Sequence, residues 1–279
     1  MSRRGACISL RTVKGVVLTA GVVLTAGVML TAGAIAVRPA PPGAARAFPG
    51  ATLQDSAQPQ WLSSATGSKY WGKRGQGHII YAVPVARRIA ALTFDDGPSV
   101  EYTPPILQAL ADFHAQATFF VIGSSARAHP WLVQEIYREG HEIGNHTEHH
   151  GQKQRVTERE IRECDREILA LTGQRPSLFR PPGGRVDDQL LRTVRQSKHL
   201  MVMWTWDVDT KDWQSPGVRK IAHTVIDHIH PGDIVIFHDG GGKRAQTVAA
   251  LRIVLKELSA RGYSFATISQ LLKNSFTTR

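Results

Sequence analysis

The chain has 279 residues, 42% of them hydrophobic and 20% charged, which is ordinary for a globular protein with a substantial buried core, in one large domain or two small ones. Its formal net charge of +11 is uneven, because residues 1–50 contain six basic residues and no acidic one, which leaves +5 for the rest. An excess of that size does not indicate a nucleic-acid-binding protein, and it is compatible with an anionic wall or membrane surface.

The first segment, residues 1–37, has a basic start followed by an uncharged apolar run from Gly15 to Val37. As a helix this run would extend roughly 34 Å, enough to cross a hydrocarbon core of about 30 Å. Its length favours a membrane anchor, whereas residues 34–36 and 45–47 resemble the cleavage sites of signal peptides, so both alternatives stay open. In either case we expect the rest of the chain to lie outside the cytoplasm.

The second segment, residues 38–77, begins with a stretch rich in Ala, Pro, Gly and Gln that is typical of a linker. Its later part, residues 61–77, is aromatic and basic, and it could cap the following domain or contact the wall. The two cysteines predict no disulfide, because Cys7 precedes the apolar run and cannot meet Cys164 after export. We expect Cys164 to be a small buried residue of a helix.

The remainder, residues 78–279, is predicted to form one domain in which strands and helices alternate. Apolar runs typical of buried strands occur at residues 89–94, 117–122, 141–144, 177–179, 200–206, 234–237 and 264–268. Amphipathic stretches typical of helices separate them, and one of these begins with a capping box of Thr157 and Glu160. Such an alternation predicts a parallel α/β fold, either a barrel or an open sheet.

Most of the unusual polar residues of this domain follow one of the apolar runs. Because the carboxyl ends of parallel strands meet at one edge of a sheet, we expect these residues to form a single site. They are Asp95, Asp96, His146, His150, Arg180, Asp209, Asp212 and His238.

Two patterns in this set indicate chemistry. His146 and His150 are four residues apart, which would bring both imidazoles to one side of a helical turn and, with a carboxylate, make a divalent-metal site. The adjacent Asp95 and Asp96 could divide two roles, one binding the metal and the other taking a proton from water. The alternatives are an accidental spacing of the histidines and a simple turn at the aspartates before Gly97.

Five motifs occur in order within residues 87–272: TFDDGPS (93–99), HTEHH (146–150), RPPGG (180–184), DTKDW (209–213) and IVIFHD (234–239). Together they resemble the motifs of the polysaccharide deacetylase family, the NodB-homology or carbohydrate esterase family 4 enzymes. The resemblance implies a distorted (β/α) barrel of about seven parallel strands. It also implies an exported, metal-dependent deacetylase that hydrolyses N-acetyl groups of GlcNAc-containing polysaccharide, such as peptidoglycan or chitin, and releases acetate.

The same scaffold leaves other functions open. An O-acetyl xylan esterase and a small cyclic-amide hydrolase are the enzymatic alternatives, and a non-catalytic wall-binding protein is the third. For the deacetylase, the implied partners are an acetylated amino-sugar polymer and, if the N-terminal segment is uncleaved, the membrane. We expect a monomer that acts outside the cytoplasm and binds no nucleic acid.

The resemblance also implies a role for each polar residue on the metal side of the site. Asp95 would be the catalytic base, and Arg180 would hold it, because a planar guanidinium suits a carboxylate better than an ammonium does. Asp96, His146 and His150 would bind the metal, usually zinc and in some members cobalt or nickel.

On the opposite side, the resemblance implies an acid and a substrate groove. Asp212 would orient the imidazole of His238, which would protonate the leaving amine. The backbone N–H of Gly183 would hold the oxyanion, Trp213 would wall the groove, and Ile236 would line the pocket for the acetyl methyl group.

Two positions depart from the family pattern. Gly183 stands where the family often has an aromatic residue, which implies a more open groove, and His149 stands where a non-histidine residue is common, which leaves His149 as an alternative ligand. We expect Trp204 and Trp206, which share one side at strand spacing, to be packing residues. Glu148 is expected at the surface or behind the metal ligands.

Overall fold

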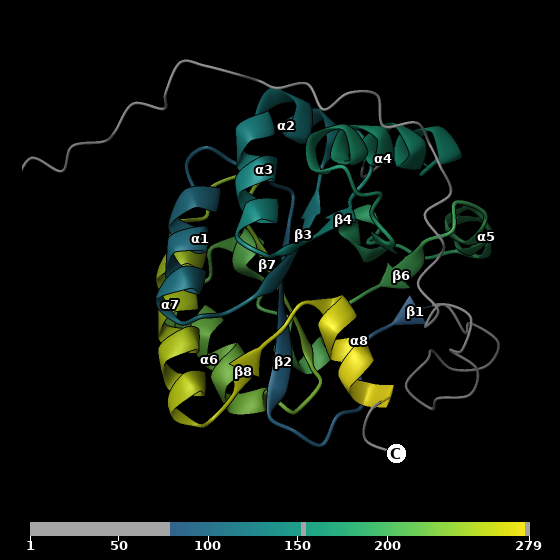
Figure 1. The fold of residues 1–279 in the computed structure, drawn as a ribbon. Coiled ribbons are helices and arrows are strands. Elements are labelled where there is room, and N and C mark those ends of the chain that lie inside the picture. Colours follow the sequence, from purple (N-terminus) through teal and green to yellow (C-terminus); the bar gives the residue numbers. More distant parts are fainter. Residues whose placement is uncertain (1–78, 152–154, 277–279) are drawn as a thin grey trace, which may run out of the picture. The chain divides into compact units, whose positions relative to one another are not determined.

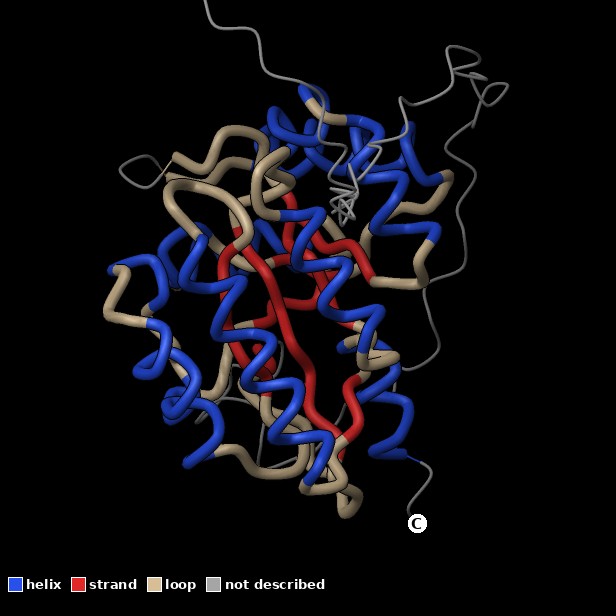
Figure 2. The backbone as a smooth tube through the Cα atoms, turned by 90° about the vertical axis from the view of Figure 1, so that its left-hand side faces the viewer, coloured by secondary structure: helices blue, strands red, loops and turns tan. Residues whose placement is uncertain are grey.

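The computed structural model describes residues 79–151 and 155–276, which form an α/β domain (Figures 1 and 2). The predicted anchor or signal segment, residues 1–37, and the linker segment, residues 38–77, lie outside the described residues. In the part of the chain that the structure describes, no helix is both long and apolar enough to span a membrane.

All strand pairs among the described residues are parallel. The strands are β1 (Ile79–Ile80), β2 (Ile89–Asp95), β3 (Ala117–Val121), β4 (Glu142–Asn145), β5 (Leu178–Phe179), β6 (Leu200–Val202), β7 (Ile234–His238) and β8 (Ser264–Phe265). Seven follow the order β1-β6-β5-β4-β3-β2-β7, and β8 pairs with β2. Because Ala82, after β1, bridges Asp233, before β7, the row curls toward a barrel. The predicted parallel α/β fold of about seven strands is confirmed, although β1 was not predicted.

Helices follow most of the strands and surround the sheet (Figures 1 and 2). They are α1 (Thr103–Asp112), α2 (Gly123–Ala128), α3 (Pro130–Arg138), α4 (Glu158–Thr172), α5 (Asp188–Gln196), α6 (Val218–His228), α7 (Ala245–Ala260) and α8 (Ile268–Phe276). Within residues 79–151 and 155–276, the short 3₁₀ turns are η2 (Pro182–Gly184), η3 (Trp206–Val208) and η4 (Asp212–Gln214).

The start and end of α4 follow from its sequence. The Thr157 side chain accepts a hydrogen bond from the backbone N–H of Glu160, which satisfies one of the free donors of the first turn. Gly173 ends the helix in the left-handed conformation, with φ of 73°, which glycine adopts without steric cost. Cys164 is fully buried within this helix, as predicted.

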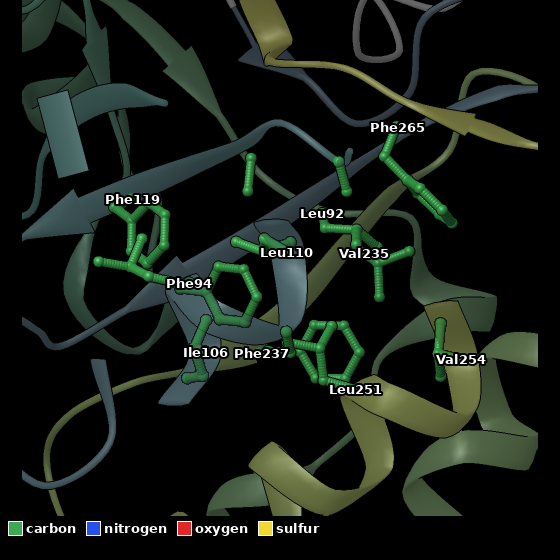
Figure 3. Close-up of a cluster of buried hydrophobic side chains, with 14 of the residues drawn as sticks. Leu92, Phe94, Ile106, Leu110, Phe119, Val235, Phe237, Leu251, Val254 and Phe265 are labelled. Atoms are coloured by element: carbon green, nitrogen blue, oxygen red, sulfur yellow. The ribbon is translucent and has the colours of Figure 1, made fainter. Parts of the chain in front are cut away.

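Strand β2 separates two cores because its side chains alternate between the faces of the sheet. Leu92 and Phe94 point outward into a cluster shared with α1 and α7, where the Phe94 ring stacks on Phe119 and Phe237 at centroid distances of 4.9 and 5.7 Å (Figure 3). Burial of each such phenylalanine side chain stabilises the folded state by about 1.5–3 kcal/mol relative to leaving it exposed. Ala91 belongs instead to the inner cluster, which α8 also joins. Asp95, four residues beyond Ala91, therefore shares its inner face.

The carboxyl ends of the strands carry the polar residues that the motifs contain. Asp95 ends β2 and is paired in register with His238, which ends β7. His146 follows β4, and Arg180 follows β5. The parallel order of the strands thus brings four of the five motifs to one edge directly, and the fifth joins them through η4.

Candidate metal and acid-base site

Asp96, His146 and His150 form a cluster whose ligand atoms all lie within 4.8 Å of one another. The Asp96 Oδ1 atom is buried and has no aligned hydrogen-bond donor, although His150 Nε2 approaches it to 3.0 Å and His146 Nε2 to 3.3 Å. Two imidazoles and a carboxylate that converge around an unsatisfied oxygen fit a divalent cation. His146 is oriented by its other nitrogen, Nδ1, which lies 2.7 Å from the backbone oxygen of Arg180.

The two histidines do not lie on a helical turn, so that part of the sequence prediction is wrong. They belong to the loop that follows β4, here called the ligand loop and defined as residues 146–150. Within it Thr147 has φ of 70° and His150 has φ of 52°, and Asp96 on the opposite side has φ of 72°. Non-glycine residues in this region are uncommon and cluster at functional sites.

Electrostatics favour an ionised Asp96. Burial by itself would raise the pKa of this carboxyl, but the imidazoles of His146 and His150 outweigh burial and hold the pKa well below its ordinary range. The alternative ligand His149 is turned away to Glu160, whose Oε1 lies 3.1 Å from His149 Nδ1. Its side chain is 61% exposed, so the structure favours His150 over His149 as the ligand.

Asp95 is buried and lies against the fully buried Arg180, whose Nη1 donates to Asp95 Oδ1 at 2.8 Å. The same Nη1 donates to the Thr93 hydroxyl at 2.7 Å. The remaining guanidinium nitrogens donate to the backbone oxygens of Val202 and Met203. Burial lowers the pKa of Arg180 and Asp95 opposes this shift. The arrangement holds one carboxylate oxygen of Asp95 and leaves the other for chemistry.

On the β7 side, His238 Nδ1 lies 2.7 Å from Asp212 Oδ1, and the His238 backbone N–H donates to Asp212 Oδ2 at 2.9 Å. The Thr247 hydroxyl also donates to Asp212 Oδ2. Burial would lower the pKa of His238, but Asp212, with help from Asp95 and Asp96, raises it to about 9. A protonated imidazole held through Nδ1 keeps Nε2 as its free donor.

The three predicted substrate contacts have different surroundings. Gly183, in η2, is exposed and has φ of 64°, and an added Cβ there would have no neighbour within 4 Å, so this residue borders open space. Trp213 is 56% exposed, whereas Ile236 is buried in β7. Asp209, also predicted to belong to the site, accepts a hydrogen bond from the Lys211 backbone N–H and shapes the turn before η4.

Trp204 and Trp206 behave differently from each other, although both were expected to pack. Trp204 is half-buried and its ring lies 5.9 Å from the Arg180 guanidinium carbon, which agrees with the prediction. Trp206 is 64% exposed, so the prediction is wrong for it. The strand ends at Val202, and the chain turns into η3, so the two side chains no longer share one buried face.

Asp239 was not identified from the sequence. It is buried, its Oδ2 accepts a hydrogen bond from the Thr103 hydroxyl at 2.6 Å, and its Oδ1 has no partner. Burial raises its pKa to about 7. An added Cβ at Gly97 would come within 2.1 Å of the Asp239 carboxylate, so this side chain lies directly behind the loop that carries Asp95 and Asp96. Its place directly after His238 was the available signal.

Comparisons with known proteins identify similar sequences and a similar solved structure. The family model described as polysaccharide deacetylase matches residues 82–202. A peptidoglycan-N-acetylglucosamine deacetylase of Bacillus cereus is 42% identical over 71% of this chain and 94% of its own length. A chitooligosaccharide deacetylase of Sinorhizobium fredii is 36% identical over 64% of this chain and 89% of its own. The crystal structure of the Bc1960 peptidoglycan N-acetylglucosamine deacetylase has a TM-score of 0.66 and 32% identity, covering 70% of this chain and 93% of that one.

Proposed function

This chain belongs to the polysaccharide deacetylase family, and we propose that it is an exported, metal-dependent N-deacetylase that removes acetyl groups from GlcNAc units of peptidoglycan or chitin oligosaccharides. The proposal rests on the observation that three groups of side chains meet at one edge of the sheet. These are the cluster of Asp96 with two histidines, the Asp95 carboxylate held by an arginine, and the imidazole of His238 held by an aspartate.

Asp96, His146 and His150 would hold the divalent metal, and two nitrogen ligands with one carboxylate suit zinc, with cobalt or nickel as the other candidates. When bound there, the metal supplies a Lewis acid that polarises the acetamide carbonyl and lowers the pKa of water.

Asp95 would act as the base that takes a proton from the attacking water. Its Oδ1 is held by Arg180, so its Oδ2 is the oxygen that receives the proton. The guanidinium holds the carboxylate by a charge-assisted hydrogen bond and fixes its orientation. Gly183 borders open space, and its backbone N–H would donate to the oxyanion that forms at the former carbonyl oxygen.

His238 would then protonate the nitrogen of the leaving amine through Nε2. Its raised pKa, about 9, keeps the imidazole charged at neutral pH, and Asp212 keeps Nδ1 occupied. The bond that breaks is the amide C–N bond, and the products are acetate and a free glucosamine unit. An amine gained for each acetamide lost makes the polymer more basic.

The relatives, the N-terminal sequence and the aromatic side chains support the proposed location and polymer. Relatives named for peptidoglycan support action on the cell wall, and the apolar run of residues 15–37 would serve as the signal or the anchor. Trp213 would wall the groove, and the exposed Trp206 offers a second aromatic face. Ile236 is buried and would line the acetyl pocket.

Acetate release is the test of the proposed activity. The purified, zinc-loaded full-length chain is incubated with chitin oligosaccharides, peptidoglycan and acetylated xylan, with the His238→Ala variant as the catalytic control. We expect acetate from at least one of the two GlcNAc polymers and far less from the variant. Acetate from xylan alone would indicate an O-acetyl esterase, and none from any polymer would favour a cyclic-amide hydrolase or a wall-binding protein.

A further inference from the structure

Glu148 lies between the two histidines of the ligand loop, but its side chain points away from the metal cluster into the protein. The side chain is only 1% exposed, and its Oε1 forms an ion pair with Arg127 Nη2 at 2.6 Å. Its Oε2 is buried and has no hydrogen-bond partner. An isolated buried carboxylate is strongly unfavourable, so the loop conformation depends on the cation that faces Glu148.

The space that Glu148 occupies exists because residue 123 is glycine. A Cβ on Gly123 would come within 2.0 Å of Glu148 Oε2. The backbone of the same segment also holds the loop, since the Gly123 N–H donates to the Thr147 oxygen at 3.0 Å and the Ser124 N–H donates to the Glu148 oxygen at 2.9 Å. The start of α2 and the ligand loop are therefore joined by main chain and side chain together.

Arg127 connects this junction to a second helix. It lies in the last turn of α2, and the Nη2 that pairs with Glu148 also lies 2.9 Å from Glu167 Oε1 on α4. The guanidinium is half exposed, which reduces the strength of each ion pair, but the Glu148 end of the contact is fully buried. One arginine thus fastens the ligand loop to two helices that do not carry metal ligands.

The ligand loop needs such an external attachment because its backbone is strained. Thr147 is β-branched and has φ of 70°, a combination that is a genuine outlier, and His150 has φ of 52°. Conformations of this kind persist only when the surroundings determine them. The strain lies at and beside the two histidines, so a loop that relaxed would turn their imidazoles away from Asp96.

We propose that the ion pair of Glu148 and Arg127 is a positioning device that holds both histidines in their metal-binding orientation and thereby sets the affinity of the site for its divalent cation. This inference rests on the metal site of the proposed function and adds residues that touch neither metal nor substrate. Removal of outer partners of metal ligands typically weakens metal binding 10- to 100-fold.

The experiment measures metal affinity instead of deacetylation. The full-length chain is stripped with a chelator and titrated with Zn²⁺ by competition with a chromophoric chelator. Co²⁺ absorption in the visible range reports the ligand geometry. The variants are Arg127→Ala, Arg127→Lys and Glu148→Gln, and circular dichroism establishes that each is folded. Arg252→Ala is the matched control. Arg252 lies in α7, is also half exposed, and forms an ion pair with Asp112 of α1 at 2.8 Å.

We expect Arg127→Ala and Glu148→Gln to weaken zinc binding about 10- to 100-fold and to change the cobalt spectrum. Arg127→Lys should recover part of the affinity, and the double variant Arg127→Ala with Glu148→Gln should be little worse than either single variant. Folded variants that bind zinc within twofold of the unsubstituted chain, like Arg252→Ala, would overturn the positioning role alone. An unsubstituted chain that binds no divalent metal would overturn the proposed site, whichever polymer is the substrate.

Discussion

Asp239 gives the sharpest test of how burial controls charge beside the turn that carries Asp95 and Asp96. Its carboxyl is buried, accepts one hydrogen bond from Thr103, and has a second oxygen without a partner. Burial, reinforced by the charges of Asp96 and Asp95, raises its pKa from 3.8 to about 7. The substitution to examine is Asp239→Asn, which keeps the shape of the side chain and removes its proton equilibrium.

The effect on stability follows from proton binding. Between pH 4 and 7 the folded protein keeps a proton on Asp239 that the unfolded chain releases, so the free energy of unfolding falls as pH rises through this window. A pKa difference of about 3 units corresponds to about 4 kcal/mol at 1.36 kcal/mol per unit. The contribution is fully present below the unfolded pKa, and it is lost by about pH 7. The Asp239→Asn variant has no such dependence, because an amide side chain does not titrate in this range.

Urea unfolding of the metal-free full-length chain at intervals between pH 4.5 and 8 measures the effect. Over this pH range, the free energy of unfolding of Asp239→Asn minus that of the unsubstituted chain should rise with pH by about 3 kcal/mol. Asp207→Asn, at an exposed position, is the control for the loss of one carboxyl group. If the free energy of unfolding changes with pH in the same way for Asp239→Asn and the unsubstituted chain, then Asp239 is ionised in the folded state and the reasoning fails.

Four further outcomes follow from the site. Asp95→Asn should lower kcat about 10²- to 10⁴-fold yet bind zinc normally, because Asp95 lies outside the metal cluster; loss of zinc would mean that the two aspartates have exchanged roles. His150→Ala should abolish zinc binding in a chelator competition, and retained metal would point to another ligand. Arg180→Lys should lower the free energy of unfolding, measured in urea, by about 3–5 kcal/mol. One ammonium cannot replace the guanidinium hydrogen bonds to the buried Asp95 carboxylate and to two backbone carbonyls. A change below 1 kcal/mol would contradict this. In a pH–rate profile, the activity should decline as pH rises through about 9, because it depends on protonated His238. Asp212→Asn should shift this decline to lower pH. A decline at the same pH in the variant would exclude His238 as the acid.

The fold was accessible from the sequence because its signals are local. Buried strands with short apolar runs and amphipathic helices between them predict a parallel α/β domain without any knowledge of packing, and all seven predicted runs overlap a strand. The short β1 carried no such signal, since two residues cannot show a period. The polar residues after the strands converge because parallel strands end at one edge, so Asp96 and the two histidines meet as expected.

Local spacing failed where the backbone is held by distant contacts. The four-residue interval between His146 and His150 predicted a helical turn, but the structure has a strained loop fastened to α2 through Gly123 and Arg127. Similarly, Trp206 was expected to pack by strand periodicity, and it is exposed because the strand ends before it.

The sequence by itself determined the fold class, the family and the set of polar residues that form the site, because each depends on short patterns and on the order of motifs. Only the tertiary structure decided which acidic side chains are buried. Glu148 and Asp239 belong to residue types that are ordinarily exposed, and they are enclosed because Gly123 and Gly97, distant in sequence, leave space for their carboxyl groups. Burial of a carboxyl group depends on what surrounds it in space, and no interval along the chain records that.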